Sequence, residues 1–291
     1  MFDDWRHNRI SVMKAHDREY FYKYVTADVA YKILYSLQVK CSSPFLFNDP
    51  FDSQIIVHHD VRDGKDLVER TVGTICKSWK GYIKDGDDKG AAQIVCDEML
   101  KDNNFVSERY QAFLRFYTDI NKVMPVIAKA DRVFCVSEIN DNLLMWAHYA
   151  DNHTGVVIKL RCVPEKASAL CAAKPIKYSL TMPLINLEDM FDTIENASLK
   201  LLEKILLTKS LDWAYEKEWR VVLKAQNENN DFDYRSLFED ELDSIYLGCR
   251  MSDKDKSAII DLVHTTRKNI KVFESRKNDL KFELEFFEIE V

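Results

Sequence analysis

Glycine and proline are scarce in this chain, at 7 and 6 of its 291 residues. The sequence has no low-complexity tract and no internal repeat, and no stretch has the composition of a linker. Because 46% of the residues are hydrophobic, a chain of this length can bury a sizeable core. We therefore expect a single domain over residues 1–291, with a helical insert or subdomain at about residues 64–130.

The chain also lacks a run of about 18 apolar residues, and its start lacks the basic and then apolar pattern of a secretory signal. The 7 cysteines form no C-x-x-C pair, which is typical of reduced thiols. These absences predict a cytoplasmic protein without membrane contact. The formal net charge of −7 argues against broad attraction to nucleic acid, which needs a basic surface.

Motifs of several common enzyme classes are absent as well. The sequence contains no G-x-x-x-x-G-K, no G-x-G-x-x-G and no G-x-S-x-G, the usual signals of nucleotide hydrolases, dinucleotide dehydrogenases and serine hydrolases. It has no H-E-x-x-H either. His58 and His59 are adjacent in a predicted strand, so they point to opposite sides and chelate poorly together. We expect no metal site.

Aromatic and β-branched runs alternate irregularly with helical patterns, which favours a mixed α and β fold over a repeating βαβ fold. Helices are expected from Thr26 as the N-cap to about Ser36, after an N-cap at Asn140 or Asp141, and after Ser252. A further, mostly helical stretch is expected at 187–210. The expected strands are 19–26, a short one from 37, 53–59, 132–137, 155–160, 174–179, 218–224 and 244–248, and two strands in 270–291.

The segment "WAYEKEWRVVL", Trp213–Leu223, is a candidate for chemistry. If the whole segment is a strand, alternate side chains point to opposite faces. Glu216, Glu218 and Arg220 then share one face. The other face is formed by Trp213, Tyr215, Trp219 and Val221. The charged face lies either toward solvent, with Glu–Arg pairs across strands, or toward a cleft.

A second candidate is "CVSEINDNLLMWAHYADNHTGVVI", in which Ser137 ends a predicted strand and His148 and Tyr149 lie on a short helix. Polar and aromatic groups between two buried strands often bind ligands, although packing explains the same pattern, and a lone His148 is more often structural. A third candidate is the turn Asn48-Asp49-Pro50, which either fixes a loop or holds a ligand.

In their order, the segments "FYKYVT", "SSPFLFNDPFD", "VFCVSEINDNLLMWAHYADNHTGVVIKL", "KSLDWAYEKEWRVV" and "SIYLG" resemble bacterial proteins catalogued as domain of unknown function 2971. The family name implies no activity. The order of the pieces is also similar, more loosely, to ADP-ribosyltransferases, including toxins and phage-defence effectors. That resemblance implies an α+β fold with a mixed, mostly antiparallel split sheet around a cleft for NAD, which is the substrate.

Carried over residue by residue, the resemblance implies that Glu218 is the catalytic carboxylate, Glu216 its acceptor-side partner and Ser137 the strand serine. Lys23 or Tyr24 takes the early-strand role. Further NAD-binding residues are Asn48, His148, Tyr149 and Arg220. A fixed carboxylate stabilises the positive charge that develops on the ribose, and a second carboxylate acts as general base.

This resemblance also implies a macromolecular acceptor, protein or nucleic acid, and an antitoxin or chaperone as a partner. Two other functions stay open at this point. One is a metal-dependent nuclease or phosphodiesterase that uses Asp49, Asp52, Glu216, Glu218 and His148. The other is a non-enzymatic sensor or interaction module of a defence system.

Overall fold

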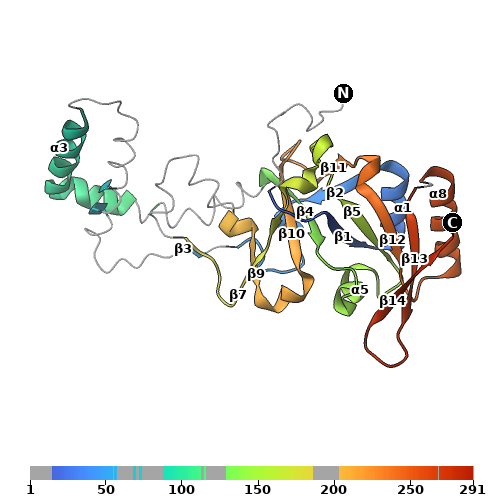
Figure 1. Ribbon diagram of the computed structural model, residues 1–291. Coiled ribbons are helices and arrows are strands. Elements are labelled where there is room, and N and C mark those ends of the chain that lie inside the picture. The colour runs from blue at the N-terminus through green and yellow to red at the C-terminus, as the bar shows by residue number, and fades with distance from the viewer. Residues whose placement is uncertain are drawn as a thin grey trace. The chain divides into compact units, whose positions relative to one another are not determined.

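A computed structural model describes residues 15–54, 56–57, 68–69, 72–73, 88–112, 115, 129–185, 203–267 and 269–290. The chain divides into two compact units (Figure 1). Unit 1 comprises Met1–Leu46, Ala130–Tyr178 and Leu211–Val291, and unit 2 comprises Phe47–Lys129 and Ser179–Ser210.

Unit 1 is built on one large sheet in which most neighbouring strands are antiparallel. The strand order is β11-β2-β4-β1-β5-β12-β13-β14, and β10 pairs with β4 and with β6. Only β12 and β13 are parallel among these described strands. The strands are β1 Tyr20–Val25, β2 Gln38–Ser42, β4 Asp131–Ser137, β5 Val156–Arg161, β6 Lys174–Pro175, β10 Glu218–Lys224, β11 Phe232–Ser236, β12 Leu242–Leu247, β13 Lys271–Lys277 and β14 Leu284–Ile289; β7 covers Lys177–Ser179. The prediction of a mixed α+β fold with a mostly antiparallel sheet is confirmed.

Helices cover both faces of this sheet (Figure 1). The larger hydrophobic cluster lies on the face covered by α1 and α8, and a smaller cluster, which includes Trp146, lies on the face covered by α5. The helices are α1 Ala27–Ser36, α5 Leu143–Tyr149 and α8 Asp253–Thr266, with 3-10 turns η2 Pro44–Leu46, η3 Pro164–Lys166, η4 Ala169–Ala172, η5 Leu211–Glu216 and η6 Glu239–Glu241.

Capping side chains fix the starts of these helices. Thr26 and Ser252 are the N-caps of α1 and α8, as predicted, and each side chain accepts a hydrogen bond from a backbone N–H of the first turn. The predicted cap of α5 at Asn140 or Asp141 is wrong. The cap is Asn142, whose Oδ1 accepts from the backbone N–H of Met145 at 3.0 Å.

The sheet is split beside β4. On one edge β4 pairs continuously with β10, whereas on its other edge it pairs with β1 only at Ser137 and with β2 only at Val133. Cys135 lies midway between these two points. The Lys23 ammonium fills the gap, because its Nζ donates to the Cys135 carbonyl oxygen at 2.7 Å. A lysine side chain thus replaces a strand–strand hydrogen bond where β1 and β2 diverge.

Unit 2 has little described sheet structure. Its strands are β3 Ile56–Val57, β8 Leu184–Ile185 and β9 Thr208–Ser210, and β3 and β8 are parallel partners. Helix α3, Asp88–Lys101, lies in the region where a helical insert is predicted, and residues 103–112 are helical too. Most of the helix predicted at 187–210 lies outside the described residues. Within the part of the chain that is described, no helix combines the length and the apolar character needed to cross a membrane.

Gly155 tests how tightly the start of β5 packs. A Cβ at this position would lie 2.2 Å from the carbonyl oxygen of Val25 and 2.9 Å from the backbone of Ala150. We expect Gly155→Ala to lower the free energy of unfolding by about 1–3 kcal/mol, because backbone atoms must shift to admit the methyl group. Denaturant unfolding followed by circular dichroism measures this change.

Gly73→Ala is the matched control, since a Cβ at helical Gly73 would meet no described heavy atom within 4 Å. Alanine also favours a helix over glycine by about 1 kcal/mol. We expect this variant to be at least as stable as the wild type. Equal stability of both variants and the wild type would contradict the close packing at Gly155.

Candidate functional site

Three sequence motifs meet on adjacent strands of unit 1. Ser137 on β4 is paired with Glu218 on β10 and, on its other side, with Tyr22 on β1. Residues directly opposite one another in antiparallel strands have side chains on the same face. Glu218, Ser137 and Tyr22 therefore form a row across three strands on one face of the sheet. This row is the centre of the candidate site.

The strand predicted at 218–224 is confirmed as β10, but the interpretation of the whole segment Trp213–Leu223 as one strand is wrong. The chain forms the 3-10 turn η5 up to Glu216, and Lys217 has a left-handed backbone with φ of 47° before β10 begins at Glu218. The Glu216 carbonyl accepts a hydrogen bond from the Ser137 hydroxyl at 2.6 Å. The Lys217 carbonyl accepts one from the Glu138 backbone N–H at 3.1 Å. These bonds hold the turn in place of further strand pairing, so Glu216 and Glu218 do not share one strand face.

Each of the two carboxylates has its own partner. Arg220 donates to Glu218 through Nε at 2.7 Å and through Nη2 at 3.2 Å. The Tyr149 hydroxyl donates to Glu216 Oε1 at 2.5 Å. Glu216, Glu218 and Arg220 are only 3%, 6% and 1% exposed. Such charge-assisted bonds in a shielded place hold both carboxylates in defined positions.

Two further side chains, Tyr178 and Cys135, lie beside Glu218. The backbone N–H of Glu218 donates to the Tyr178 hydroxyl at 2.8 Å. Cys135 lies opposite Arg220 in the ladder. Burial and then the Glu218 carboxylate raise the pKa of the Cys135 thiol, so this cysteine is a neutral thiol at pH 7.

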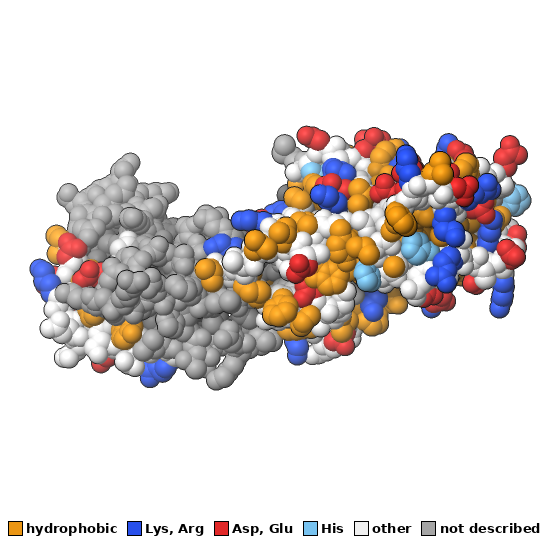
Figure 2. Space-filling view, turned by 90° about the horizontal axis from the view of Figure 1, so that it is seen from below, with side chains coloured by type: hydrophobic (Ala, Val, Ile, Leu, Met, Phe, Trp, Pro, Cys, Tyr) orange, Lys and Arg blue, Asp and Glu red, His pale blue; other side chains and the backbone are white. Residues whose placement is uncertain are grey.

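A cluster of aromatic rings lies beside Glu216. Tyr215 packs against Trp213 with ring centroids 6.1 Å apart and against His148 at 6.5 Å, and His148 lies 6.4 Å from the Tyr149 ring. His148 is exposed and the other three are half-buried. Seen from below, hydrophobic side chains gather on the face that carries α5 and η5 (Figure 2). This cluster offers ring faces on which a planar group can stack.

The predicted early-strand residues lie in different surroundings. Tyr24 is buried, and its hydroxyl donates to the Ile139 carbonyl at 3.0 Å. Burial is the main cause that raises its pKa. Lys23 is two residues from Phe21 and from Val25, which belong to the larger core cluster, so it shares their face of β1, opposite the face of Glu218. The structure thus does not bring Lys23 to the row.

The remaining predicted residues belong to unit 2. Asn48 is exposed and belongs to unit 2, as do buried Asp49 and Asp52. Asp49 Oδ1 accepts from the Phe51 backbone N–H at 2.9 Å. Asp52 lies 3.9 Å from the Lys209 ammonium. Among the described residues, no group of three or more His, Cys, Asp or Glu side chains could hold a metal ion. His58 and His59 lie outside the described residues.

Sequence reasoning missed three residues of this site, Tyr22, Cys135 and Tyr178. Tyr22 directly precedes the two residues that were predicted on this strand, Lys23 and Tyr24. Alternation places the Tyr22 and Tyr24 side chains on the same face and does not distinguish between them. The strand register that places Tyr22 opposite Ser137 cannot be predicted from the sequence of the strand itself. Tyr178 is 40 residues from Glu218 along the chain, so no local pattern joins them.

One comparison with known proteins gives a match. Residues 145–221 match the model of the family described as Protein of unknown function (DUF2971). The predicted resemblance to this family is confirmed over that segment, which runs from α5 to β10 and includes Glu216, Glu218 and Arg220. No curated protein and no solved structure matches the chain.

Arg220 and Arg276 form a matched pair of arginines. Each follows a glutamate by two residues on a strand and bonds to it, but Arg220 is 1% exposed and the Arg276 side chain is 60% exposed. We expect Arg220→Gln to lower the free energy of unfolding by about 3 kcal/mol or more, because a buried carboxylate loses its cation. Denaturant unfolding is the measurement.

The control, Arg276→Gln, removes an exposed ion pair. We expect it to change the free energy of unfolding by less than about 1 kcal/mol. A similar decrease in the free energy of unfolding of the two variants would show that burial of the Glu218–Arg220 pair does not add to its contribution to stability.

Proposed function

We propose that this protein consumes NAD and transfers ADP-ribose to a protein or nucleic-acid acceptor, as a toxin or phage-defence effector. The observation that carries the proposal is the row of Glu218, Ser137 and Tyr22 on three adjacent strands, next to a second carboxylate at Glu216. This order of an early strand, a serine strand and a glutamate strand is the one that the ADP-ribosyltransferase resemblance implies.

The chemistry needs a fixed negative charge beside the ribose. When the bond between the nicotinamide nitrogen and the ribose C1′ breaks, its electron pair leaves with nicotinamide and the ribose gains oxocarbenium character. A carboxylate held near the ribose hydroxyls stabilises that charge. Glu218 is suited to this role, because Arg220 orients its carboxylate through two charge-assisted hydrogen bonds.

The acceptor step needs a base. The acceptor oxygen attacks C1′ and must lose its proton. Glu216 is the second carboxylate of the site and acts as the general base that receives this proton. The Tyr149 hydroxyl orients Glu216. The half-buried Trp213 and Tyr215 provide ring faces for nicotinamide or adenine. Ser137 acts as a positioning residue in this proposal, because its hydroxyl is bonded to the Glu216 carbonyl.

One observation favours a second candidate function, that of a non-enzymatic interaction module. Glu216 and Glu218 are 3% and 6% exposed, and both carboxylates are bonded to side chains of the protein itself. In this case the carboxylates stabilise the fold, and the aromatic cluster around Tyr215 contacts a partner. The two functions differ in whether NAD is consumed.

Nicotinamide release from NAD by the full chain tests the proposal. We expect Glu218→Gln to lower the rate about 100-fold or more, because an uncharged amide stabilises the ribose cation poorly. Tyr22→Phe should lower the rate while keeping the ring in place. Glu274→Gln is the matched control, since Glu274 is also bonded to an arginine two residues later, and its rate should equal that of the wild type.

Circular dichroism of each variant establishes that it is folded. Equal release by the wild type and Glu218→Gln, or no release by folded wild type with any candidate acceptor, would refute the enzyme and favour the interaction module.

A further inference from the structure

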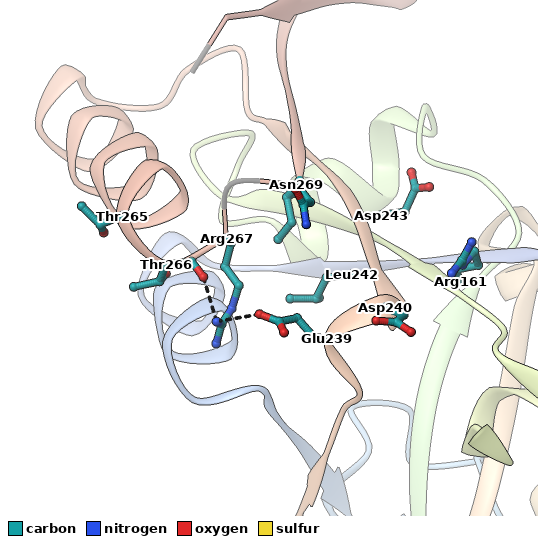
Figure 3. Close-up of a pocket in the computed structure, with 10 residues that line it drawn as sticks. Arg161, Glu239, Asp240, Leu242, Asp243, Thr265, Thr266, Arg267 and Asn269 are labelled. Carbon is teal, nitrogen blue, oxygen red and sulfur yellow. Dashed lines mark hydrogen bonds and ion pairs between the residues drawn. The ribbon is translucent and has the colours of Figure 1, made fainter. Parts of the chain in front are cut away.

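Unit 1 has a pocket at the end of the sheet where β5 ends and β12 begins, beside the C-terminus of α8 (Figure 3). Its volume is about 530 Å³, and its lining includes Arg161, Glu239, Asp240, Asp243, Arg267 and Asn269. A pocket of this size suits a small molecule, because such sites typically measure about 300–1,000 Å³. None of these residues belongs to the row of Glu218, Ser137 and Tyr22.

Every carboxylate that lines this pocket is matched by a cation of the protein. Glu239 lies 3.4 Å from Arg267 Nη1, as Figure 3 shows, and Asp243 lies 3.1 Å from the Lys159 ammonium. Asp240 bonds to Lys166. This bond is the main cause that holds the pKa of the Asp240 carboxyl below its usual range. Each of the three carboxylates therefore already has a cationic partner.

Arg161, in contrast, acts on the Asp240 carboxylate only through its charge, which contributes after Lys166 to the lowered pKa of that carboxyl. It forms no ion pair and no side-chain hydrogen bond there, although it is half-buried and lines the pocket. Four cations, Lys159, Arg161, Lys166 and Arg267, face three carboxylates in and around the pocket. Of these cations, Arg161 is the one for which no ion pair is formed among the described residues.

Other hydrogen-bond donors of the pocket are also unused within the described part of the chain. Arg267 Nε is shielded from solvent and has no acceptor, although the same guanidinium donates to Glu239, to Thr266 and to Tyr35. The Asn269 side-chain amide makes no hydrogen bond either, and Figure 3 shows it between Arg267 and Asp243 in that view. A buried donor without an acceptor is destabilising, so a ligand oxygen at this position would satisfy it.

We propose that this pocket binds a small polar molecule through one oxyanion group, a carboxylate or a phosphate, held by the Arg161 guanidinium. A guanidinium presents two parallel N–H donors that match either group. The Asn269 amide and Arg267 Nε donate hydrogen bonds to oxygen atoms in the polar part of the same molecule. The threonine hydroxyls of α8 that line the pocket donate to helix carbonyls, so they contribute acceptors only.

Isothermal titration calorimetry of the full chain with inorganic phosphate, adenosine monophosphate and citrate tests the proposal. We expect at least one probe to bind the wild type and Arg161→Gln to weaken that binding about ten-fold or more, since it removes a charged donor pair. Asn269→Ala should weaken it less. Arg276→Gln is the control, because Arg276 is an exposed arginine outside the pocket, and it should bind as the wild type does.

The probes separate the two sources of the oxyanion. Binding of phosphate or adenosine monophosphate without citrate assigns a phosphate ligand, and binding of citrate alone assigns a carboxylate. Absence of binding by all three probes, or binding that persists unchanged in folded Arg161→Gln, overturns the proposal. The latter result would place the ligand elsewhere, and it leaves the NAD proposal untouched because no residue is shared.

Discussion

The candidate site depends on the position of Ser137. Its backbone pairs with strands on both sides, at Glu218 and at Tyr22, and its hydroxyl bonds to the Glu216 carbonyl. One residue thereby fixes the register of three strands and the turn that precedes one of them. Because a shift of one residue would move every side chain of a strand to the other face, this register decides which side chains can meet. Lys217, with its left-handed backbone, then turns the chain between the two carboxylates.

The sequence predicted those parts of the fold that depend on local chemistry. The caps at Thr26 and Ser252 and the mixed class of the fold follow from side chains close along the chain. The cap of α5 was misplaced because Asn140, Asp141 and Asn142 are three consecutive capping residues. The interpretation of Trp213–Leu223 as one continuous strand is wrong for a different reason, although the strand predicted at 218–224 is β10. The hydroxyl that holds η5 comes from a residue 79 positions away, and alternation within a segment carries no information about it.

In the candidate site, the sequence likewise predicted residue types but not the pairing of strands. The residues with charged or hydroxyl groups were identifiable by type, and Arg220 was expected on the face of Glu218, where it lies. The choice among Tyr22, Lys23 and Tyr24 required the register of β1 against β4. Lys23 illustrates the limit. A cation in an early strand suggests a ligand for phosphate, yet its ammonium closes a gap in the sheet, which only the pairing of neighbouring strands reveals.

The protonated state of the Cys135 thiol has a consequence for oxidative damage. Oxidants and alkylating agents attack thiolates, and a thiol with a raised pKa forms few of them at pH 7. Burial likewise raises the pKa of Cys41 to about 12. The raised pKa values therefore disfavour the thiolate from which sulfenic acid forms at both cysteines. Burial, together with a carboxylate on the adjacent strand, thus keeps the Cys135 thiol in its protonated, less reactive form.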